Sequence, residues 1–491
     1  MHFLEEMNWE MVQYWVNNAL HLLSENLEDV NVTDSVNLRA VILDILLEVN
    51  EHDAYSHIVM NNALSKYQYL DKNERAFITR LAGGTIEKQI ELDYIIDLFS
   101  KTKITKMKPL IRNLLRMSVY QIKYMSQVPD SAVCNEAVKL ANKRGFSTLK
   151  GFVNGVLRNI ARGINEIKYP PKENDFAGYL SIKHSIPRWI VDKWLKSYDK
   201  NTVELILDGF NQDKHTYIRC NRAITDKVSL VAKLESENVI VKEVPYVDYA
   251  LEISGYNYLG ELESFQNGMF QIQDISSMIA GVAAGIEAGA YVIDTCAAPG
   301  GKCIHAAESL VTANRNAGKS EECGHIDARD LTDLKVSLII ENISRLKTPN
   351  ISVKTWDARV LDTNVLEKAD VLLADLPCSG LGIIGRKADI KYKMTPEKQE
   401  NLVKLQREIL ETIQQYVKPG GKLIYSTCTI NEDENAGNVK WFTSNFPFEL
   451  ESLETELPFF KDEKTIQEGY VQLLPGVHGT DGFFVAKLRR E

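Results

Sequence analysis

Apolar residues recur with a helical period along the first third of the chain, from residue 36 onward. In the segment 37–51 they fall at Leu38, Val41, Ile42, Ile45, Leu46 and Val49. This spacing places them on one face of a helix. The segment 151–160 repeats the pattern, and few β-branched runs interrupt it. We therefore predict an all-α bundle over residues 36–168. The tandem prolines of "YPPKEND" (169–175) cannot continue a helix, so a linker follows.

A mixed pattern follows the prolines. Residues 169–214 read as a linker with short helices, one of them near 187–196. Strand-like runs then appear at 216–221, 239–244 and 250–253, with a helix between the first two that Thr225 is expected to cap. These elements predict a small α+β module over residues 215–265.

Apolar runs of strand length alternate with helical segments through the remaining residues, 266–491. The runs cover 291–296, 324–329, 351–356, 370–375 and 422–427. Such a series is typical of buried parallel strands between helices. A helix begins after Thr395, with Pro396 in its first turn, and is expected to end at "KPGG" (418–421). We predict a Rossmann-like α/β domain with a doubly wound, mostly parallel sheet that ends in a strand at 483–490.

Charge is distributed unevenly along the 491 residues, although the net charge is −10. Residues 1–35 form an acidic extension with seven acids and no Lys or Arg. Residues 101–168 carry fourteen Lys or Arg and three acids, a local net charge of +11. A basic surface of this size favours a nucleic-acid partner.

Other bulk features narrow the class of protein. No apolar run approaches the length of a membrane span, and the acidic N-terminus does not resemble a secretory signal. Seven cysteines without a CxxC pair favour free thiols over disulfides or a zinc site. We expect a cytoplasmic monomer with no membrane partner and no metal.

The segment "DTCAAPGGK" (294–302) predicts a ligand-binding loop between a strand and a helix that begins near Gly301. In open α/β sheets, ligands bind beyond the carboxyl ends of the strands, and small residues let the backbone approach them. The spacing is neither GxGxxG nor a phosphate loop, because Cys303 follows Lys302. The ligand is therefore expected to be smaller than a dinucleotide.

Acidic residues end the next strands as well. Asp327 and Asp330 follow the second strand, Asp357 the third and Asp375 the fourth. An acid after the second strand commonly binds ribose hydroxyls. Spacing alone leaves Asp327 and Asp330 as alternatives for that role.

Two cysteines, Cys378 and Cys428, come just after the fourth and fifth strands. Either one alone is most simply a packing residue. Together, beside a cofactor-type loop, they indicate chemistry on a pyrimidine, whose carbon 5 becomes nucleophilic only after a thiolate adds to carbon 6. A paired base must first leave the stack. This chemistry does not decide which thiol attacks.

Several segments together resemble the bacterial 16S rRNA cytosine-5 methyltransferases of the RsmB (Sun/Fmu) family. They are "DTCAAPGGK", "ADLPCSG" (374–380) with the following "GRKADIKYK", "IYSTCTINEDEN" (424–435), "FQIQDISS" (270–277) and "HGTDGFFVAKLRR" (478–490). The resemblance covers about residues 37–491. It extends to a NusB-like domain at 36–168 and an RRM-like module at 215–265.

This resemblance implies S-adenosyl-L-methionine as the cofactor, 16S ribosomal RNA as the partner and methylation of carbon 5 of a specific cytosine through a cysteine–C6 adduct. The cofactor residues would be Cys296, Ala297, Ala298, Pro299, Gly300, Gly301 and Lys302, with Asp330 at the ribose, Asp357 beside the adenine and Asp375 near the methionine end or the target base. Cys428 corresponds to the nucleophile. Cys378 corresponds to the cysteine that resolves the adduct.

Alternative functions are a cytosine-5 methyltransferase acting on tRNA or another rRNA site, and a non-catalytic NusB-like RNA-binding assembly factor. Intact thiols at both positions disfavour the second. Arg386, Lys387 and Lys391 follow Cys378 and are predicted to contact RNA. Cys296 and Cys303 are expected to have packing roles, and residues 312–324 lengthen the connection between the first two strands.

Overall fold

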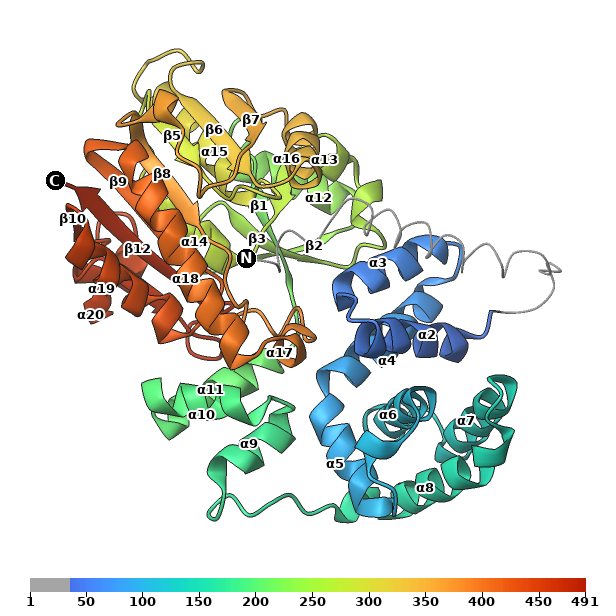
Figure 1. Ribbon diagram of the computed structural model, residues 1–491. Helices are drawn as coiled ribbons and strands as arrows, with labels where there is room; N and C mark the ends of the chain where they lie inside the picture. Colours follow the sequence, from blue (N-terminus) through green and yellow to red (C-terminus); the bar gives the residue numbers. More distant parts are fainter. Residues whose placement is uncertain (1–35) are drawn as a thin grey trace.

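The computed structural model describes residues 36–491, in which a helical bundle, three linking helices, a small sheet and a large α/β domain follow one another along the chain (Figure 1). The predicted acidic extension, residues 1–35, lies outside the described residues. Within 36–491, every helix is too short or too polar to cross a bilayer.

Helices α2 to α8 form the predicted all-α bundle. Their bounds are α2 Leu38–Glu51, α3 Ser56–Lys66, α4 Lys72–Glu87, α5 Gln89–Phe99, α6 Pro109–Tyr124, α7 Asp130–Lys143 and α8 Lys150–Gly163. The apolar stripe identified in α2 is buried in the bundle core, with Leu43 and Leu46 fully covered. Asp71 and Glu74 start α4 with reciprocal side-chain caps on backbone N–H groups.

Three short helices connect the bundle to the rest of the chain: α9 Phe176–His184, α10 Arg188–Ser197 and α11 Lys200–Phe210. They share a core with loops of the α/β domain, because Trp194 and Leu207 pack in one cluster with Leu381 and Ile430. The indole N–H of Trp194 donates to Asn431 Oδ1 at 3.1 Å. These helices therefore support the loops that carry the predicted thiols.

The small module is an antiparallel sheet in the order β2-β3-β1-β4, with helices α12 and α13. Its bounds are β1 Thr216–Cys220, α12 Lys227–Ser236, β2 Ile240–Glu243, β3 Ala250–Ser254, α13 Glu263–Gln266 and β4 Phe270–Ile272. Strand β4 lies beyond residue 265, so the module takes one strand from the segment assigned by sequence to the α/β domain. The cap of α12 is Asp226, whose side chain accepts from Ser229 N, and the prediction of Thr225 was wrong by one residue.

The large sheet has the order β10-β12-β9-β8-β5-β6-β7, with β11 paired to β12. Its strands are β5 Tyr291–Asp294, β6 His325–Asp330, β7 Ile351–Thr355, β8 Ala369–Asp375, β9 Val417–Thr427, β10 Phe448–Leu450, β11 Tyr470–Leu473 and β12 Phe483–Arg490. The five predicted strands, β5 to β9, are parallel, and β10 to β12 add antiparallel pairs at one side. The predicted mostly parallel fold is confirmed.

Helices cover the sheet: α14 Ile275–Ala283, α15 Gly301–Asn316, α16 Asp333–Leu346, α17 Ile390–Lys393, α18 Pro396–Ile413, α19 Ala436–Asn445 and α20 Lys464–Gln467. Thr395 caps α18 as expected, through Lys398 N. However, α18 ends at Ile413, and the "KPGG" segment lies within β9. This segment interrupts the pairing of β9 with β8, which is made at Val417 and resumes at Lys422.

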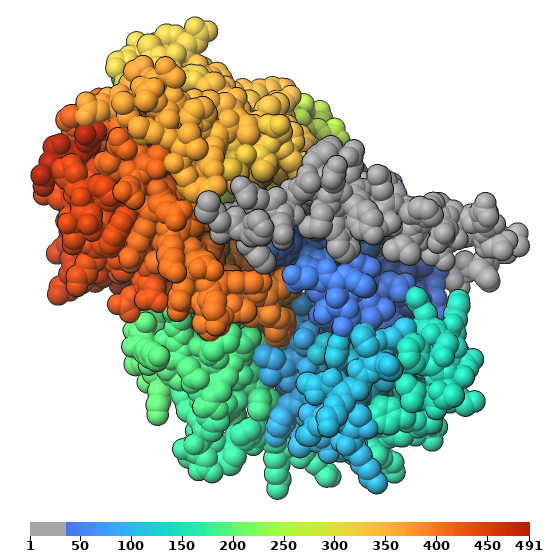
Figure 2. Space-filling model, in the orientation of Figure 1, coloured from blue at the N-terminus to red at the C-terminus, as the bar shows by residue number. Residues whose placement is uncertain are grey.

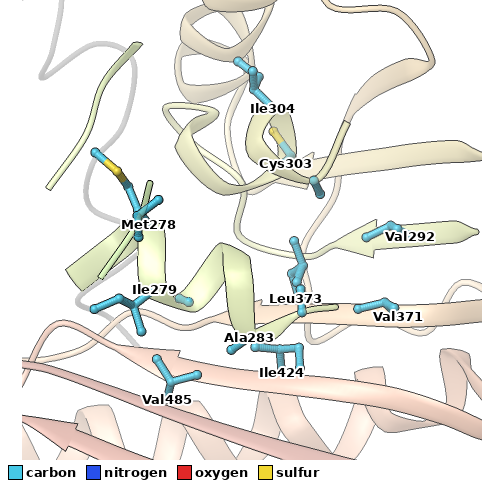
Figure 3. Close-up of a cluster of buried hydrophobic side chains, with 14 of the residues drawn as sticks. Met278, Ile279, Ala283, Val292, Cys303, Ile304, Val371, Leu373, Ile424 and Val485 are labelled. Carbon is cyan, nitrogen blue, oxygen red and sulfur yellow. The ribbon is translucent and has the colours of Figure 1, made fainter. Parts of the chain in front are cut away.

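One core cluster lies between α14 and the sheet (Figure 3). In that view, Ile279 and Ala283 of α14 lie toward Leu373, Ile424 and Val485 of three strands, whereas Met278 points away from them. Cys303 on α15 belongs to the same buried cluster, as expected of a packing residue.

A fully buried ion pair fastens the small module to α15. Arg219 on β1 donates from Nε and Nη2 to the two carboxylate oxygens of Glu308, each at 2.9 Å. Its Nη1 also donates to the carbonyl of Gly301 at 3.1 Å. Further along, Arg315 donates to the carbonyls of Arg222 and Ala223. The module is therefore joined directly to the helix that follows the predicted cofactor loop.

Arg219→Ala should lower the free energy of unfolding by about 3–5 kcal/mol, because it leaves the Glu308 carboxylate buried without its cation. The measurement is the denaturant midpoint followed by circular dichroism. Lys233→Ala is the control, since Lys233 pairs with the exposed Glu263 on the same module and such pairs contribute little. Equal midpoints for the two variants would contradict this role of Arg219.

The loop after Cys378 also joins the bundle. Asp389 accepts hydrogen bonds from the backbone N–H and hydroxyl of Ser56, at 2.9 and 2.5 Å. Lys393 donates to the carbonyls of Asp53 and Ala54. In Figure 2 the orange part of the α/β domain meets the blue bundle and the green linking helices near the centre of the molecule. The bundle is thus fixed to a loop of the candidate site.

Candidate active site

The predicted cofactor loop runs from the end of β5 into the first turn of α15. Gly300 caps this helix with φ of 107°, a conformation that favours glycine. A Cβ on Gly300 would also approach Ile304 Cδ1 to 3.0 Å. Because the first N–H groups of a helix have no partner within it, α15 offers donors to an anionic group at this point.

The structure separates the two acids that follow the second strand. Asp330 Oδ2 accepts from Ala298 N at 2.9 Å, so this carboxylate lies against the cofactor loop. Asp327 instead pairs with the buried guanidinium of Arg329, whose Nε is 3.0 Å away. Asp327 therefore faces Arg329, whereas Asp330 is the acid that contacts the loop.

Lys302 links the loop to strands β8 and β9. Its Nζ donates to Asp375 Oδ2 at 2.5 Å, and Asp375 Oδ1 accepts from Ser426 Oγ at 2.9 Å. Asp375 and Ser426 are paired across the two strands. Burial alone would lower the pKa of Lys302, but the Asp375 carboxylate and the nearby Cys428 sulfur outweigh it and raise the pKa. Lys302 therefore stays an ammonium beside the thiols.

Asp357 lies just beyond β7 and is bonded within its own loop. The side chain and backbone N–H of Arg359 donate to it, and these hydrogen bonds lower the pKa of the carboxyl group. It is about one quarter exposed, with 28% of its side chain accessible. It stands at the same edge of the sheet as Asp330. Its hydrogen bonds come from Arg359 and not from the cofactor loop.

The two predicted thiols lie together. Cys378 follows β8 and Cys428 follows β9, which are neighbouring parallel strands, and their sulfur atoms are 3.2 Å apart. Both side chains are partly exposed and neither forms a disulfide. The carbonyl of Cys428 accepts from Gly382 N at 3.0 Å, which joins the two loops. The sequence prediction that one rim carries both thiols is confirmed.

The surroundings of the two sulfurs differ. The hydrogen bond with Cys428, burial and the charge of Glu434 raise the pKa of Cys378 well above its ordinary value. Cys428 instead lies within the field of the Lys302 ammonium. Because two thiols in hydrogen-bond contact cannot both ionise easily, this environment favours a proton on Cys378.

Asp294, at the end of β5, is fully buried behind the loop. Its Oδ1 is 3.4 Å from Cys296 N, whereas Oδ2 has no hydrogen-bond partner among the described residues. Burial and the nearby charge of Asp375 raise the pKa of Asp294 to about 7. This carboxyl group is therefore neutral in the folded protein at mildly acidic pH.

Asp294→Asn should change stability in a pH-dependent way. The native carboxyl group titrates at about 7 in the fold and about 4 when unfolded, so its stabilising effect is present at low pH and lost as pH rises through 7. The amide of the variant does not titrate, so the variant does not lose this stability as the pH rises. The free energy of unfolding of the variant, relative to that of the wild type, should therefore rise by about 2–4 kcal/mol from pH 5 to pH 8. Denaturation curves at the two pH values measure this, and a pH-independent difference would contradict it.

The structure contradicts one of the three RNA contacts predicted after Cys378, that of Lys391. Arg386 donates to Asp274 and Asp481 and to the carbonyl of His215. Lys391 is buried, with Nζ 2.9 Å from the carbonyl of Glu87, and burial lowers its pKa to about 7. The prediction for Lys391 was wrong, because its buried side chain fastens the loop to the bundle. Arg386 is exposed, and its contact with RNA stays a prediction. For Lys387 the contact stays a prediction.

Basic residues of the bundle are also partly neutralised. Six of the fourteen cations in 101–168 form ion pairs with acids: Lys103, Arg112, Arg116, Lys123, Lys139 and Arg144. Eight are exposed and have no ion pair within residues 36–491: Lys101, Lys106, Lys108, Lys143, Lys150, Arg158, Arg162 and Lys168. The basic surface that remains is smaller than the local charge suggested, yet it is still substantial.

Sequence reasoning missed three residues of the site. Asp294 was noted only as the last residue of a strand, Ser426 carries no signal beyond its place in β9, and Glu434 is one of three acids at 432–434. Of the three acids at 432–434, only Glu434 is buried. The apolar alternation of β9 could have placed Ser426 on the same face as Cys428.

Known proteins resemble this chain throughout the described range. Residues 285–489 match the family described as 16S rRNA methyltransferase RsmB/F, residues 36–162 match the NusB family, and residues 186–257 match the ferredoxin-like domain of RsmF/B-like methyltransferases. Among solved structures, PH0851 superposes with a TM-score of 0.75 at 25% identity, covering 93% of this chain and 100% of that one. A methyltransferase homologue from Pyrococcus horikoshii covers 64% of this chain and 98% of its own, with a TM-score of 0.53 at 26% identity.

Full-length relatives extend the same conclusion. The probable ribosomal RNA small subunit methyltransferase B of Bacillus subtilis is 34% identical over 461 residues, which cover 92% of this chain and 99% of the relative. The Escherichia coli ribosomal RNA small subunit methyltransferase B is 29% identical over 424 residues, 86% of this chain and 92% of the relative. The chain therefore belongs to the RsmB/F methyltransferase family, together with the ribosomal RNA small subunit methyltransferase B proteins.

Proposed function

We propose that this chain methylates carbon 5 of a specific cytosine in 16S ribosomal RNA, with S-adenosyl-L-methionine as the cofactor and Cys428 as the covalent nucleophile. The observation that carries the proposal is the pair of thiols 3.2 Å apart beside the loop 296–302. The match to the RsmB/F family supports it. So do the named activities of the relatives, which are ribosomal RNA small subunit methyltransferases.

The loop fits the cofactor. Gly300 allows the positive φ of the turn into α15, and the N-terminus of this helix suits a carboxylate. Asp330 lies where an acid can accept hydrogen bonds from ribose hydroxyls, and Asp357 lies further along the same edge for the adenine. Cys296 to Lys302 would surround the methionine part. When bound, S-adenosyl-L-methionine supplies the electrophilic methyl group that carbon 5 takes up.

The side chains of this site fit the remaining steps. The Cys428 thiolate forms a bond to carbon 6 of the extruded cytosine, which makes carbon 5 nucleophilic. After methylation, a base takes the proton from carbon 5, the ring double bond re-forms and the carbon–sulfur bond breaks, returning the electron pair to Cys428. Lys302 stabilises the thiolate before attack. The thiol of Cys378, in hydrogen-bond contact, stabilises it again as it leaves.

RNA binding is assigned to the exposed cations of the bundle. We expect affinity for 16S rRNA to fall on the order of 10³-fold between 50 and 200 mM salt, because binding releases counterions from about six phosphates. Titrations over this range measure the slope of the logarithm of affinity against the logarithm of salt concentration. Lys150→Ala with Arg158→Ala should reduce the slope by about 2, while Lys172→Ala, which breaks a pair with Glu204 outside the basic segment, should not. A flat salt response would remove the bundle from the interface.

Bisulfite sequencing of 16S rRNA tests the proposed activity in cells. One cytosine should lose its methylation when the gene is deleted and regain it with the wild-type gene. Unchanged 16S rRNA together with a lost methyl group in tRNA would overturn the proposed substrate.

A further inference from the structure

Glu434 is a fully buried carboxylate directly behind the loop that carries Cys378. Side chains and backbone of neighbouring segments donate five hydrogen bonds to it: Ser379 N at 2.8 Å, Ser379 Oγ at 2.6 Å, Asn431 Nδ2 at 2.9 Å, Gln406 Nε2 at 3.2 Å and Gln399 Nε2 at 3.4 Å. Amide and backbone N–H groups can only donate, so both carboxylate oxygens act as acceptors.

These bonds join three segments, and Gln406 adds a second link among them by donating to the carbonyl of Pro377 as well. Ser379 belongs to the loop after β8, Asn431 to the loop after β9, and Gln399 and Gln406 to α18. A buried charge is costly unless it is fully hydrogen-bonded, so the segments are fixed relative to Glu434. Glu434 therefore helps to hold both thiol-bearing loops, together with the bond from Gly382 N to the carbonyl of Cys428.

We propose that Glu434 is a positioning residue of the thiol pair: its hydrogen bonds to Ser379 hold the thiol of Cys378 as a donor facing the sulfur of Cys428. The proposal rests on the function proposed above, in which Cys428 attacks the cytosine. It assigns a role to a side chain that touches neither substrate nor cofactor.

The arrangement of charges supports this asymmetry. Glu434 binds the residue next to Cys378, whereas Lys302 lies on the side of Cys428. A fixed negative charge disfavours a second anion nearby, and an ammonium favours one. Without Glu434, the two sulfurs would differ less, and the Cys378 loop would lose the backbone hydrogen bond that holds Ser379 in place.

Glu434→Gln tests the proposal, because it keeps the shape of the side chain and removes the charge. Iodoacetamide alkylation of the free protein, read for each cysteine by mass spectrometry across pH, reports which thiol ionises. At pH 8 the alkylation rate of Cys378 should rise at least about tenfold, the effect of one pKa unit. In turnover assays kcat should fall about 10²-fold with an unchanged KM for S-adenosylmethionine. Glu432→Gln, an exposed acid two residues away, is the matched control and should behave as wild type.

Two further variants keep the test decisive if Glu434→Gln does not fold. Glu434→Asp keeps the charge and should leave Cys378 unreactive. Ser379→Ala keeps the charge but removes the hydroxyl link, so it should lower kcat without changing the pH profile of Cys378. An unchanged alkylation profile in folded Glu434→Gln, or full kcat in Ser379→Ala, would overturn the proposal. Because alkylation needs neither RNA nor cofactor, these outcomes are separate from a failure of the proposed methyl transfer.

Discussion

Cys428→Ala should abolish methyl transfer to 16S rRNA, a loss on the order of 10⁴-fold or more, as expected when a covalent nucleophile is removed. Without a thiolate at carbon 6, carbon 5 of cytosine cannot act as a nucleophile. The measurement is transfer of a radiolabelled methyl group to unmodified rRNA. Affinity for S-adenosylmethionine should stay near normal, because Cys428 interacts with the cofactor loop only electrostatically, through the ammonium group of Lys302.

Cys323→Ala is the matched control for this substitution. Cys323 is partly exposed, lies between α15 and β6 and is far from both thiols in sequence. It should retain wild-type turnover. Retained turnover in Cys428→Ala itself would exclude this residue as the nucleophile.

Cys378→Ala should slow turnover and accumulate a protein–RNA complex that survives denaturation. The remaining thiolate can still attack, but the leaving sulfur loses the hydrogen bond now made at 3.2 Å. Breakdown of the adduct therefore slows more than its formation. Denaturing gels with labelled rRNA should show the complex in Cys378→Ala and not in the wild type.

Cys378→Ser separates the hydrogen-bond role from packing. A hydroxyl can still donate to the leaving sulfur, so this variant should accumulate less complex than Cys378→Ala. Accumulation in Cys428→Ala instead of Cys378→Ala would exchange the two roles.

Local signals were sufficient for most of the fold. The stripe in α2, the Thr395 cap of α18 and the five apolar runs that became parallel strands depend on neighbouring residues, which a sequence displays directly. Errors arose where two local signals compete. Thr225 and Asp226 are both good caps, and the "KPGG" segment has turn residues although it lies within β9, between the residues that pair with β8.

The candidate site was predictable where its residues end strands. Cys378, Cys428 and Asp375 lie at one rim because parallel strands place their carboxyl ends together. Spacing alone did not separate Asp327 from Asp330; the resemblance favoured Asp330, and the structure adds that Arg329 pairs with Asp327.

Long-range partners were not predictable from the sequence. Asp389 binds Ser56, and Arg219 binds Glu308 across the domain boundary, so neither pair shares a sequence window. The same reason explains the overestimated basic surface. Glu51 and Asp93, outside the counted segment, neutralise Arg112 and Arg116.

The most direct measurement is to locate the covalent bond between protein and RNA. Ribosomal RNA containing 5-fluorocytosine traps the adduct, because fluorine at carbon 5 cannot leave as the proton does. Trypsin separates the two thiols into the peptides 369–386 and 423–440. The account predicts a nucleotide attached to Cys428 in the second peptide. The attachment should form only when S-adenosylmethionine is present as the methyl donor. Attachment to Cys378, or no attachment at all, would contradict it.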